Sequence, residues 1–302
     1  MAKVIIAIHG LGNKPSKVLL EKWGKMSIKE GIENLGLTID IPEFELVYWA
    51  DLLYERPQMP NLKDKNSPFY LDEIYTKAPK NFKVEKHEIR QKFVDLFKKL
   101  VYSIFLKKDY KLRYAFVSQK LLHKYFYELE VYFNGDSQFD SEFNFQVKEE
   151  IISRLTSMLK KHHNDDIMLI GHSMGAIIAF DVLSFIAVET KIHTFVTMGA
   201  PLGAPFVMSR IAAHSKSTFG TIKLQTPEAV QKHWYNFSDI MDKIALDYKL
   251  ADDFAVNSRN VKCTDKLVTN NYVMNRIANP HKSFGYLRTP EFIQCLKEFI
   301  YE

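Results

Sequence analysis

The sequence predicts an α/β protein in which a mostly parallel central sheet is flanked by helices. Apolar runs of strand length recur along the 302-residue chain, and glycine, proline or polar residues bound each of them. These runs are apolar on both faces, as in parallel strands that helices cover on each side. Segments with helical spacing lie between them, and this alternation is typical of crossover connections in a parallel sheet.

Six runs are predicted as strands, because each is short, rich in apolar or aromatic residues and followed by turn-forming or polar residues. The first lies almost at the N-terminus, and a loop separates the last one from the C-terminal helix. They are VIIAIHG (4–10), FELVYW (44–49), IMLIGHS (167–173), HTFVTMGAP (193–201), WYNFSD (234–239) and KLVTNNYV (266–273).

Four helices are predicted from apolar residues that recur three and four positions apart. The first follows the N-cap candidate Ser16, and the last begins at Pro290 with Thr289 as its N-cap, because proline is favoured at the first helical position. The apolar faces of the first three are Leu19, Leu20, Trp23 and Met26, then Val147, Ile151, Leu155 and Met158, and then Ile177, Ile178, Val182, Leu183 and Ile186.

Residues 51–143 depart from the alternation, because they separate two strands by far more than a crossover requires. Residues 77–124 hold 14 Lys and Arg against 4 Asp and Glu, a net charge of +10, whereas the whole chain carries +5. We expect a helical, basic and aromatic-rich cap inserted into a single domain that spans 1–302. The alternative is peripheral contact of 77–124 with an anionic membrane surface. The helical stripe is Phe93, Leu96, Phe97, Leu100, Val101, Ile104 and Phe105.

Composition excludes several classes of protein. The modest net charge of +5, and lysines that interleave with an apolar stripe, argue against nucleic-acid binding. Two isolated cysteines, Cys263 and Cys295, form neither a disulfide framework nor a metal motif. No apolar run approaches the roughly 20 residues of a membrane-spanning helix, and the N-terminus is typical of a strand rather than a signal peptide. We therefore expect a cytoplasmic protein that requires no cofactor or metal.

The stretch LIGHSMG (169–175) predicts a nucleophile. Ser173 stands between Gly171 and Gly175, directly after a strand and before a helix. In Gly-x-Ser-x-Gly at such a junction, the serine sits on a sharp turn that exposes its hydroxyl, and the glycines leave room for that turn. The N–H of Met174, at the start of the helix, is predicted to face an oxyanion.

A second oxyanion donor is expected from the loop after a neighbouring strand. HGLG (9–12) follows the first strand, and its glycines let the main chain approach a ligand, so we predict the N–H of Leu11 as this donor. His9 is interpreted as a residue that braces the loop, and His172 as a packing residue.

Three stretches together resemble the lipases and esterases of the α/β-hydrolase superfamily: HGLG near the N-terminus, GHSMG after a strand and TMGAPLGAP after the next strand. The resemblance covers 1–50, 145–205 and 230–302. It implies a catalytic triad in the chain order nucleophile, acid, histidine. The insertion has no counterpart in this resemblance.

The resemblance implies an acid after the strand WYNF, where three aspartates are candidates. Related sequences carry an Asn on this strand and an Asp before x-Val-Ala. Asn236 and Asp242, the latter followed by KIA, match best, although Lys243 stands where the family often has proline. Asp239 is the alternative, and Asp247 is the third aspartate.

His281 is the predicted base. It lies in NPHKSFGY, which resembles the His-Ser-x-Tyr loop of the family and comes third in chain order. His162 and His163, at a polar helix end, are interpreted as solvated.

These residues predict a serine hydrolase that cleaves a carboxylic ester or thioester through an acyl-enzyme on Ser173. The substrate is then a small-molecule acyl ester or a lipid. The alternative is a non-catalytic protein that uses the same fold for binding or membrane interaction.

Overall fold

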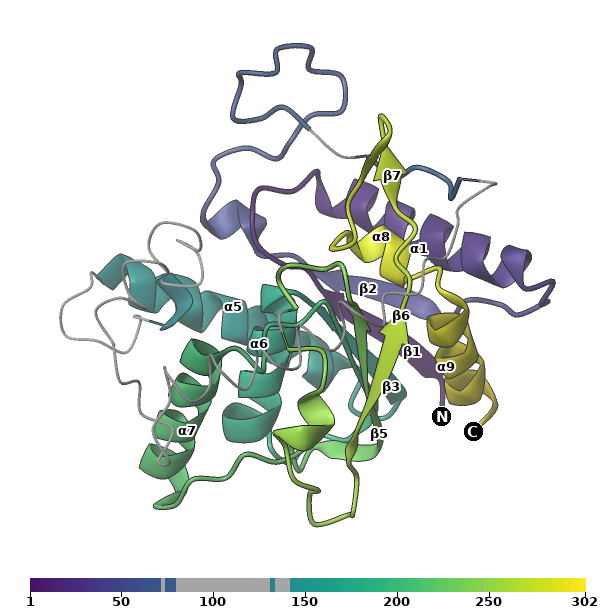
Figure 1. Ribbon diagram of the computed structural model, residues 1–302. Coiled ribbons are helices and arrows are strands. Elements are labelled where there is room, and N and C mark those ends of the chain that lie inside the picture. Colours follow the sequence, from purple (N-terminus) through teal and green to yellow (C-terminus); the bar gives the residue numbers. More distant parts are fainter. Residues whose placement is uncertain (72–73, 80–130, 134–141, 246) are drawn as a thin grey trace.

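The computed structural model describes residues 1–71, 74–79, 131–133, 142–245 and 247–302. Its centre is a six-stranded parallel sheet in the order β2-β1-β3-β4-β5-β6, which Figure 1 shows with its strands fanning across the molecule. The predicted α/β architecture is confirmed. The strands are β1 (Lys3–Ile8), β2 (Glu43–Val47), β3 (Asp166–His172), β4 (Ile192–Met198), β5 (Val230–Asp239) and β6 (Cys263–Val268).

The six predicted strands agree with these elements, except that the last one is displaced. β6 ends at Val268, whereas the sequence predicts a strand that continues to Val273. The backbone turns away because the N–H of Asn270 donates to the side chain of Asp239 at 2.6 Å, and the N–H of Tyr272 donates to the Asn270 side chain at 3.1 Å. The chain then forms an antiparallel hairpin of β7 (Val273–Met274) and β8 (Ile277–Ala278).

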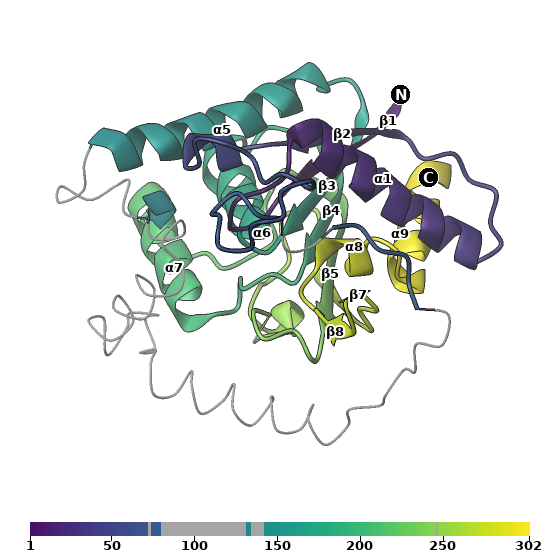
Figure 2. The same cartoon turned by 90° about the horizontal axis from the view of Figure 1, so that it is seen from above.

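Helices cover both faces of the sheet (Figure 2). One layer holds α5 (Glu142–Lys161), α6 (Met174–Asp181), continued by a π-helical turn η2 (Val182–Ile186), and α7 (Pro205–Phe219). The other holds α1 (Lys17–Asn34), α8 (Ser283–Tyr286) and α9 (Pro290–Tyr301). Alternate strand residues divide between two buried clusters, because neighbouring side chains point to opposite faces: Ile6 belongs to the first layer and Ile5 to the second. Single 3₁₀ turns form at η1 (Ala50–Leu52) and η3 (Leu250–Asp252).

The buried face of α1 differs from the predicted one. The residues of α1 that are buried against the sheet and α9 include two glycines and none of the predicted large apolar side chains. Met26, one of the predicted residues, is 38% exposed. A Cβ atom at Gly31 would lie 2.7 Å from Ile293, and one at Gly24 would lie 3.1 Å from Phe44. The helix therefore packs too closely for a side chain at these two positions. The buried residues are Gly24, Ser27, Ile28, Glu30, Gly31 and Ile32.

The predicted cap at 51–143 lies largely outside the described residues, as do the helical stripe of the insertion and all but the first residues of 77–124. Its described ends are fastened to the domain. The hydroxyl of Tyr132, a side chain that is 1% exposed, donates to Asp181 at 2.8 Å. At the other end, Tyr75 and the N–H of Ala78 donate to Glu30 at 2.7 and 2.6 Å. Among the described helices, none is long and apolar enough to cross a bilayer. Membrane contact through 77–124 stays a prediction.

Candidate active site

Ser173 occupies a sharp turn between β3 and α6. Its φ of 55° and ψ of −124° are backbone angles that side-chain-bearing residues rarely adopt. The flanking glycines make the turn sterically feasible. A Cβ atom at Gly171 would lie 2.5 Å from the Cα of Ala176, and one at Gly175 would lie 2.4 Å from the carbonyl oxygen of Ile8. The local sequence thus builds a turn that holds the serine at the carboxyl end of the sheet.

The structure brings Ser173, His281 and Asp242 into one hydrogen-bonded chain. The Nε2 atom of His281 lies 3.0 Å from the hydroxyl of Ser173, and its Nδ1 atom lies 2.8 Å from Oδ2 of Asp242. The three residues come from the β3–α6 turn, the loop after β5 and the loop between β8 and α8. The Asp242 side chain has no exposure and that of His281 is 25% exposed, so the carboxylate is shielded while the imidazole remains accessible.

Four hydrogen bonds surround the carboxylate of Asp242. Its Oδ1 atom accepts from the N–H groups of Ile244 and Ala245 at 2.9 and 3.4 Å, and its Oδ2 atom accepts from the hydroxyl of Tyr286 at 2.8 Å in addition to His281. Burial, and then the charge of Asp242, raise the pKa of Tyr286 well above its usual value, so this hydroxyl remains a donor. The sequence argument missed Tyr286, although it closes the NPHKSFGY stretch that pointed to His281.

The alternative acid, Asp239, is the last residue of β5. Its side chain accepts from the N–H groups of Met241 and Asn270 at 2.7 and 2.6 Å. Its own N–H donates to the Tyr286 oxygen at 3.0 Å. Asp247 accepts the N–H of Lys249 at 3.0 Å and does not contact the imidazole. Of the three aspartates, Asp242 is therefore the one hydrogen-bonded to His281.

The HGLG loop passes directly beside Ser173. A Cβ atom at Gly10 would lie 2.7 Å from the Cβ of Ser173, so only glycine fits this approach. The N–H of Trp49 donates to Nε2 of His9 at 3.0 Å, which leaves Nδ1 to donate to the carbonyl of Gly10 at 2.8 Å. Because N–H and C=O point in opposite directions across a trans peptide, this bond fixes the direction of the Leu11 N–H. Met174, the second predicted donor, follows the serine as the first residue of α6.

His9 is buried and His172 is half-buried, and the pKa of each is lowered, which favours the neutral form. Burial, and then nearby Lys14, lower the pKa of His9 from 6.5 to about 3. Burial, and then His281, lower the pKa of His172 well below 6.5. The Nε2–H of His172 donates to the carbonyl of His281 at 2.7 Å and so holds that loop. Neither residue is placed to act as the base, because the unprotonated nitrogen of His9 already accepts a hydrogen bond and His172 bonds the backbone.

These two histidines predict that stability falls in mild acid. Both stay neutral in the folded chain but bind a proton below pH 6.5 once it unfolds, so lowering the pH favours unfolding. Each contributes up to about 1.4 kcal/mol per pH unit. Urea unfolding between pH 6.5 and 5 should show this slope, with a smaller slope in His9→Gln and an unchanged one in the exposed His163→Gln. Equal slopes in the wild type and in His9→Gln would contradict the neutral burial of His9.

His162 corrects an expectation, since the sequence indicated a solvated residue. It is 5% exposed, and its Nε2 and Nδ1 atoms lie 2.6 and 2.9 Å from Glu45 and Asp165. Burial lowers the pKa of His162, but hydrogen bonds to Asp165 and then to Glu45 raise it, and the pKa is raised overall. Glu43, Glu45 and His162 could converge on a metal ion. Glu45 is already paired with His162 and Lys161, which gives these residues a sufficient structural role.

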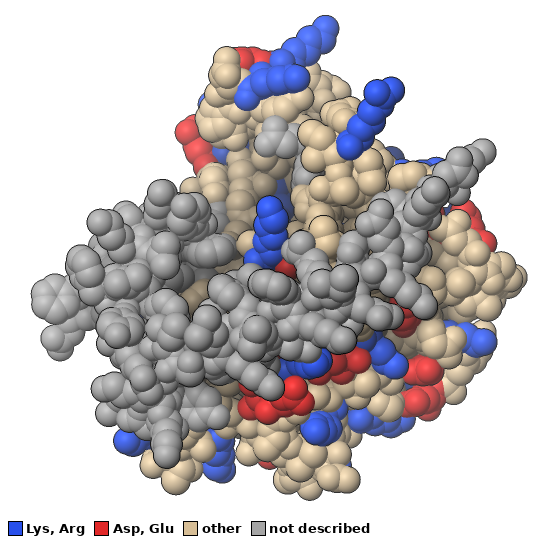
Figure 3. All heavy atoms as spheres, in the orientation of Figure 1, with Lys and Arg blue, Asp and Glu red and all other residues tan. Residues whose placement is uncertain are grey.

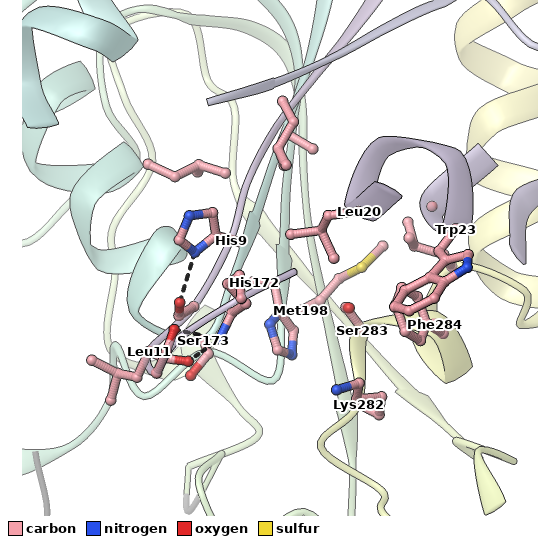
Figure 4. A pocket seen from close by; sticks show the side chains of 18 of the residues that line it. His9, Leu11, Leu20, Trp23, His172, Ser173, Met198, Lys282, Ser283 and Phe284 are labelled. Atoms are coloured by element: carbon pink, nitrogen blue, oxygen red, sulfur yellow. Dashed lines mark hydrogen bonds between the residues drawn. The ribbon is translucent and has the colours of Figure 1, made fainter. Parts of the chain in front are cut away.

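A cavity of about 520 Å³ opens at Ser173 and His281. It extends past the HGLG loop and between α1, the sheet and α8. Figure 4 shows Ser173, His172 and Leu11 at one side of this cavity, and Trp23 and Phe284 at the other. Leu20 and Trp23, which the sequence places on the buried face of α1, are half-buried residues that line this space instead.

Comparison with known proteins agrees with this architecture. The profile of a family described as "PGAP1-like alpha/beta domain", a family with a hydrolase fold, matches residues 132–276. No curated protein matches the sequence significantly. The crystal structure of a lipase-esterase related protein from Clostridium acetobutylicum ATCC 824 covers 99% of this chain and 93% of its own at 10% identity. Its TM-score of 0.30 is too low to support a conclusion about this chain. The family match and the six-stranded parallel sheet confirm the resemblance at the level of the fold.

Proposed function

We propose that this chain, which has the α/β-hydrolase fold, is a serine hydrolase that cleaves carboxylic esters through an acyl-enzyme on Ser173. The observation that carries the proposal is the continuous hydrogen-bonded chain from Ser173 through His281 to Asp242. A serine hydroxyl is a weak nucleophile until an adjacent base takes its proton. His281 is at hydrogen-bond distance for that transfer, and the cavity gives a substrate access to the same atoms.

In the first half-reaction, Nε2 of His281 takes the Ser173 proton while the oxygen attacks the acyl carbon. The imidazolium is stabilised by the buried carboxylate of Asp242, which also holds Nδ1 in its protonated tautomer. The hydroxyl of Tyr286 and the N–H groups of Ile244 and Ala245 keep this carboxylate in place. His281 then gives its proton to the leaving oxygen, and the ester bond breaks.

The negative charge that develops on the carbonyl oxygen requires donors beside Ser173. We assign these to the N–H groups of Leu11 and Met174. The bond from His9 to the carbonyl of Gly10 orients the Leu11 N–H before the substrate arrives, and the start of α6 presents the Met174 N–H. Such preorganised donors are worth about 10²–10³ in kcat each. In the second half-reaction, His281 activates water to release the acid.

A fluorophosphonate probe tests the proposal, because it labels only an activated serine. We expect stoichiometric labelling of the wild type together with turnover of p-nitrophenyl acetate, and loss of both in Ser173→Ala. Ser153→Ala, which alters an exposed serine on α5, is the matched control and should behave as the wild type. If the wild type is not labelled, or if Ser173→Ala is labelled equally, the proposal is wrong.

A further inference from the structure

The cavity at Ser173 continues well beyond the atoms that the proposed reaction uses. Its volume of about 520 Å³ lies within the range of pockets that enclose whole small organic ligands, roughly 300–1,000 Å³. In Figure 4, Met198 and Leu20 lie between Ser173 and the pair Trp23 and Phe284. The rings of that pair meet edge to face with centroids 5.9 Å apart. The cavity is therefore elongated, with the serine toward one end and an aromatic wall toward the other.

The two ends differ in chemistry. Side chains between α1 and the sheet are apolar and mostly buried, for example Phe44, Leu46 and Phe284, at 5%, 4% and 2% exposure. We call this part of the cavity the inner arm. Polar lining residues include Asn13 and Lys14 in the loop after β1, and Gln58, all of them partly exposed. Lys282 also lines the cavity, with its Nζ atom 5.5 Å from the centre of the Phe284 ring. In Figure 3, basic side chains project at the top of the molecule, where Figure 1 shows the 55–70 segment and β7. Among the residues that the structure describes, those that line the cavity include no Asp or Glu.

We propose that the inner arm binds the acyl chain of the substrate, and that this chain is unbranched, apolar and of medium length; the inference rests on the proposed function. The leaving group has to depart while the acyl group stays on Ser173, so the group in the buried arm is the one that remains attached. The departing alcohol or thiol then leaves past the polar residues toward solvent. Apolar walls favour methylene groups, because the transfer of apolar surface from water into an apolar environment is favourable.

Leu20 and Trp23 are the residues that set the usable length. Both stand on α1 and both line the cavity, although the apolar pattern of the helix placed them in the core. Leu20 lies between the serine and the aromatic wall, and Trp23 forms part of that wall. A larger side chain at position 20 shortens the inner arm, because the sheet residues opposite are buried and closely packed.

Ester chain length is the direct test. We expect the wild type to have a higher kcat/KM for p-nitrophenyl octanoate than for the acetate. In Leu20→Trp, the octanoate-to-acetate ratio of kcat/KM should fall at least about tenfold, in the range that extra methylenes produce in a hydrophobic pocket. Val18→Trp adds the same side chain to the exposed side of α1, where Val18 is 75% exposed, and should keep the wild-type ratio.

Binding without turnover gives a second readout. In the Ser173→Ala protein, decanoate should quench or shift tryptophan fluorescence in a saturable way. Trp49 and Trp234 are 1% and 0% exposed, so the change should come from Trp23 and should disappear in Ser173→Ala/Trp23→Phe. Calorimetry on the same proteins should show that Leu20→Trp weakens decanoate binding at least about tenfold relative to Val18→Trp.

The outcomes separate this inference from the proposed function. If the wild type is labelled and turns over acetate, but Leu20→Trp keeps both the wild-type chain-length ratio and decanoate affinity, the inner arm is not the acyl site and the function stands. If the wild type is labelled but prefers the acetate ester and does not bind decanoate, the inner arm is likewise not the acyl site and the function stands. If no ester is hydrolysed and the probe does not label Ser173, both proposals fail.

Discussion

Asp242→Asn is expected to lower kcat for ester hydrolysis by about 10⁴-fold with little change in fold. The Asp242 carboxylate accepts the Nδ1–H of His281 at 2.8 Å and the Tyr286 hydroxyl at the same distance. An amide at this position presents N–H to one of these partners, which favours the wrong imidazole tautomer, and it carries no charge to stabilise the cation. Steady-state hydrolysis of p-nitrophenyl acetate measures the loss, and circular dichroism checks the fold.

Asp239→Asn is the matched control, because the sequence weighed this aspartate for the same role. Asp239 accepts backbone N–H groups from Met241 and Asn270 and lies beside the Tyr286 hydroxyl. Its replacement should reduce stability and lower kcat far less than Asp242→Asn does. Equal losses in the two variants would mean that the loop, and not a specific carboxylate, supports the reaction. A larger loss in Asp239→Asn would reverse the assignment.

Glu30→Gln is expected to lower the free energy of unfolding by about 3–5 kcal/mol. Glu30 and Arg288 form a buried pair at 2.9 Å, with side-chain exposures of 9% and 0%. Removing one charge leaves the other buried without compensation, and that is strongly destabilising. Arg288 also donates to the carbonyl of Thr76 and to the side chain of Asn271, both at 2.6 Å. The pair therefore joins α1, one end of the insertion and the segment that follows α8.

Urea unfolding at neutral pH measures this change. Glu33→Gln is the matched control, since Glu33 belongs to the same helix and pairs with Lys29 at 3.8 Å with both side chains more than half exposed. An exposed pair of this kind contributes at most about 1 kcal/mol. Similar losses in the free energy of unfolding for Glu30→Gln and Glu33→Gln would show that the buried pair does not contribute the expected stability.

Much of the fold was predictable from the sequence, because the signals are local. Apolar runs of strand length alternate with helical spacing, and six of these runs are strands of the sheet. The turn at Ser173 depends on neighbours within a few positions, so GHSMG alone indicates it. Thr289 caps α9 by accepting the N–H of Phe292 at 3.3 Å, as its position before Pro290 predicts. The chain order of serine, aspartate and histidine also led to the residues that lie together.

Features that depend on contacts between distant segments could be determined only from the tertiary structure. The sequence favoured Asp242 but left Asp239 as an alternative, and the packing of the loop after β5 against the loop after β8 brings Asp242 to His281. Tyr286 joins this network for the same reason. The apolar pattern of α1 could not show that its glycines pack closely against the core while Leu20 and Trp23 line the cavity.

The sequence by itself thus determined the α/β sheet, the turn that carries Ser173 and the small set of residues able to act with it, because hydrophobic period and backbone sterics operate over a few residues. The tertiary structure decided which carboxylate meets the imidazole, which buried charges pair and where a cavity is left beside the serine. These properties depend on distances between segments that are far apart along the chain. Close packing fixes those distances to within an ångström or so, and the pattern of a single segment does not encode them.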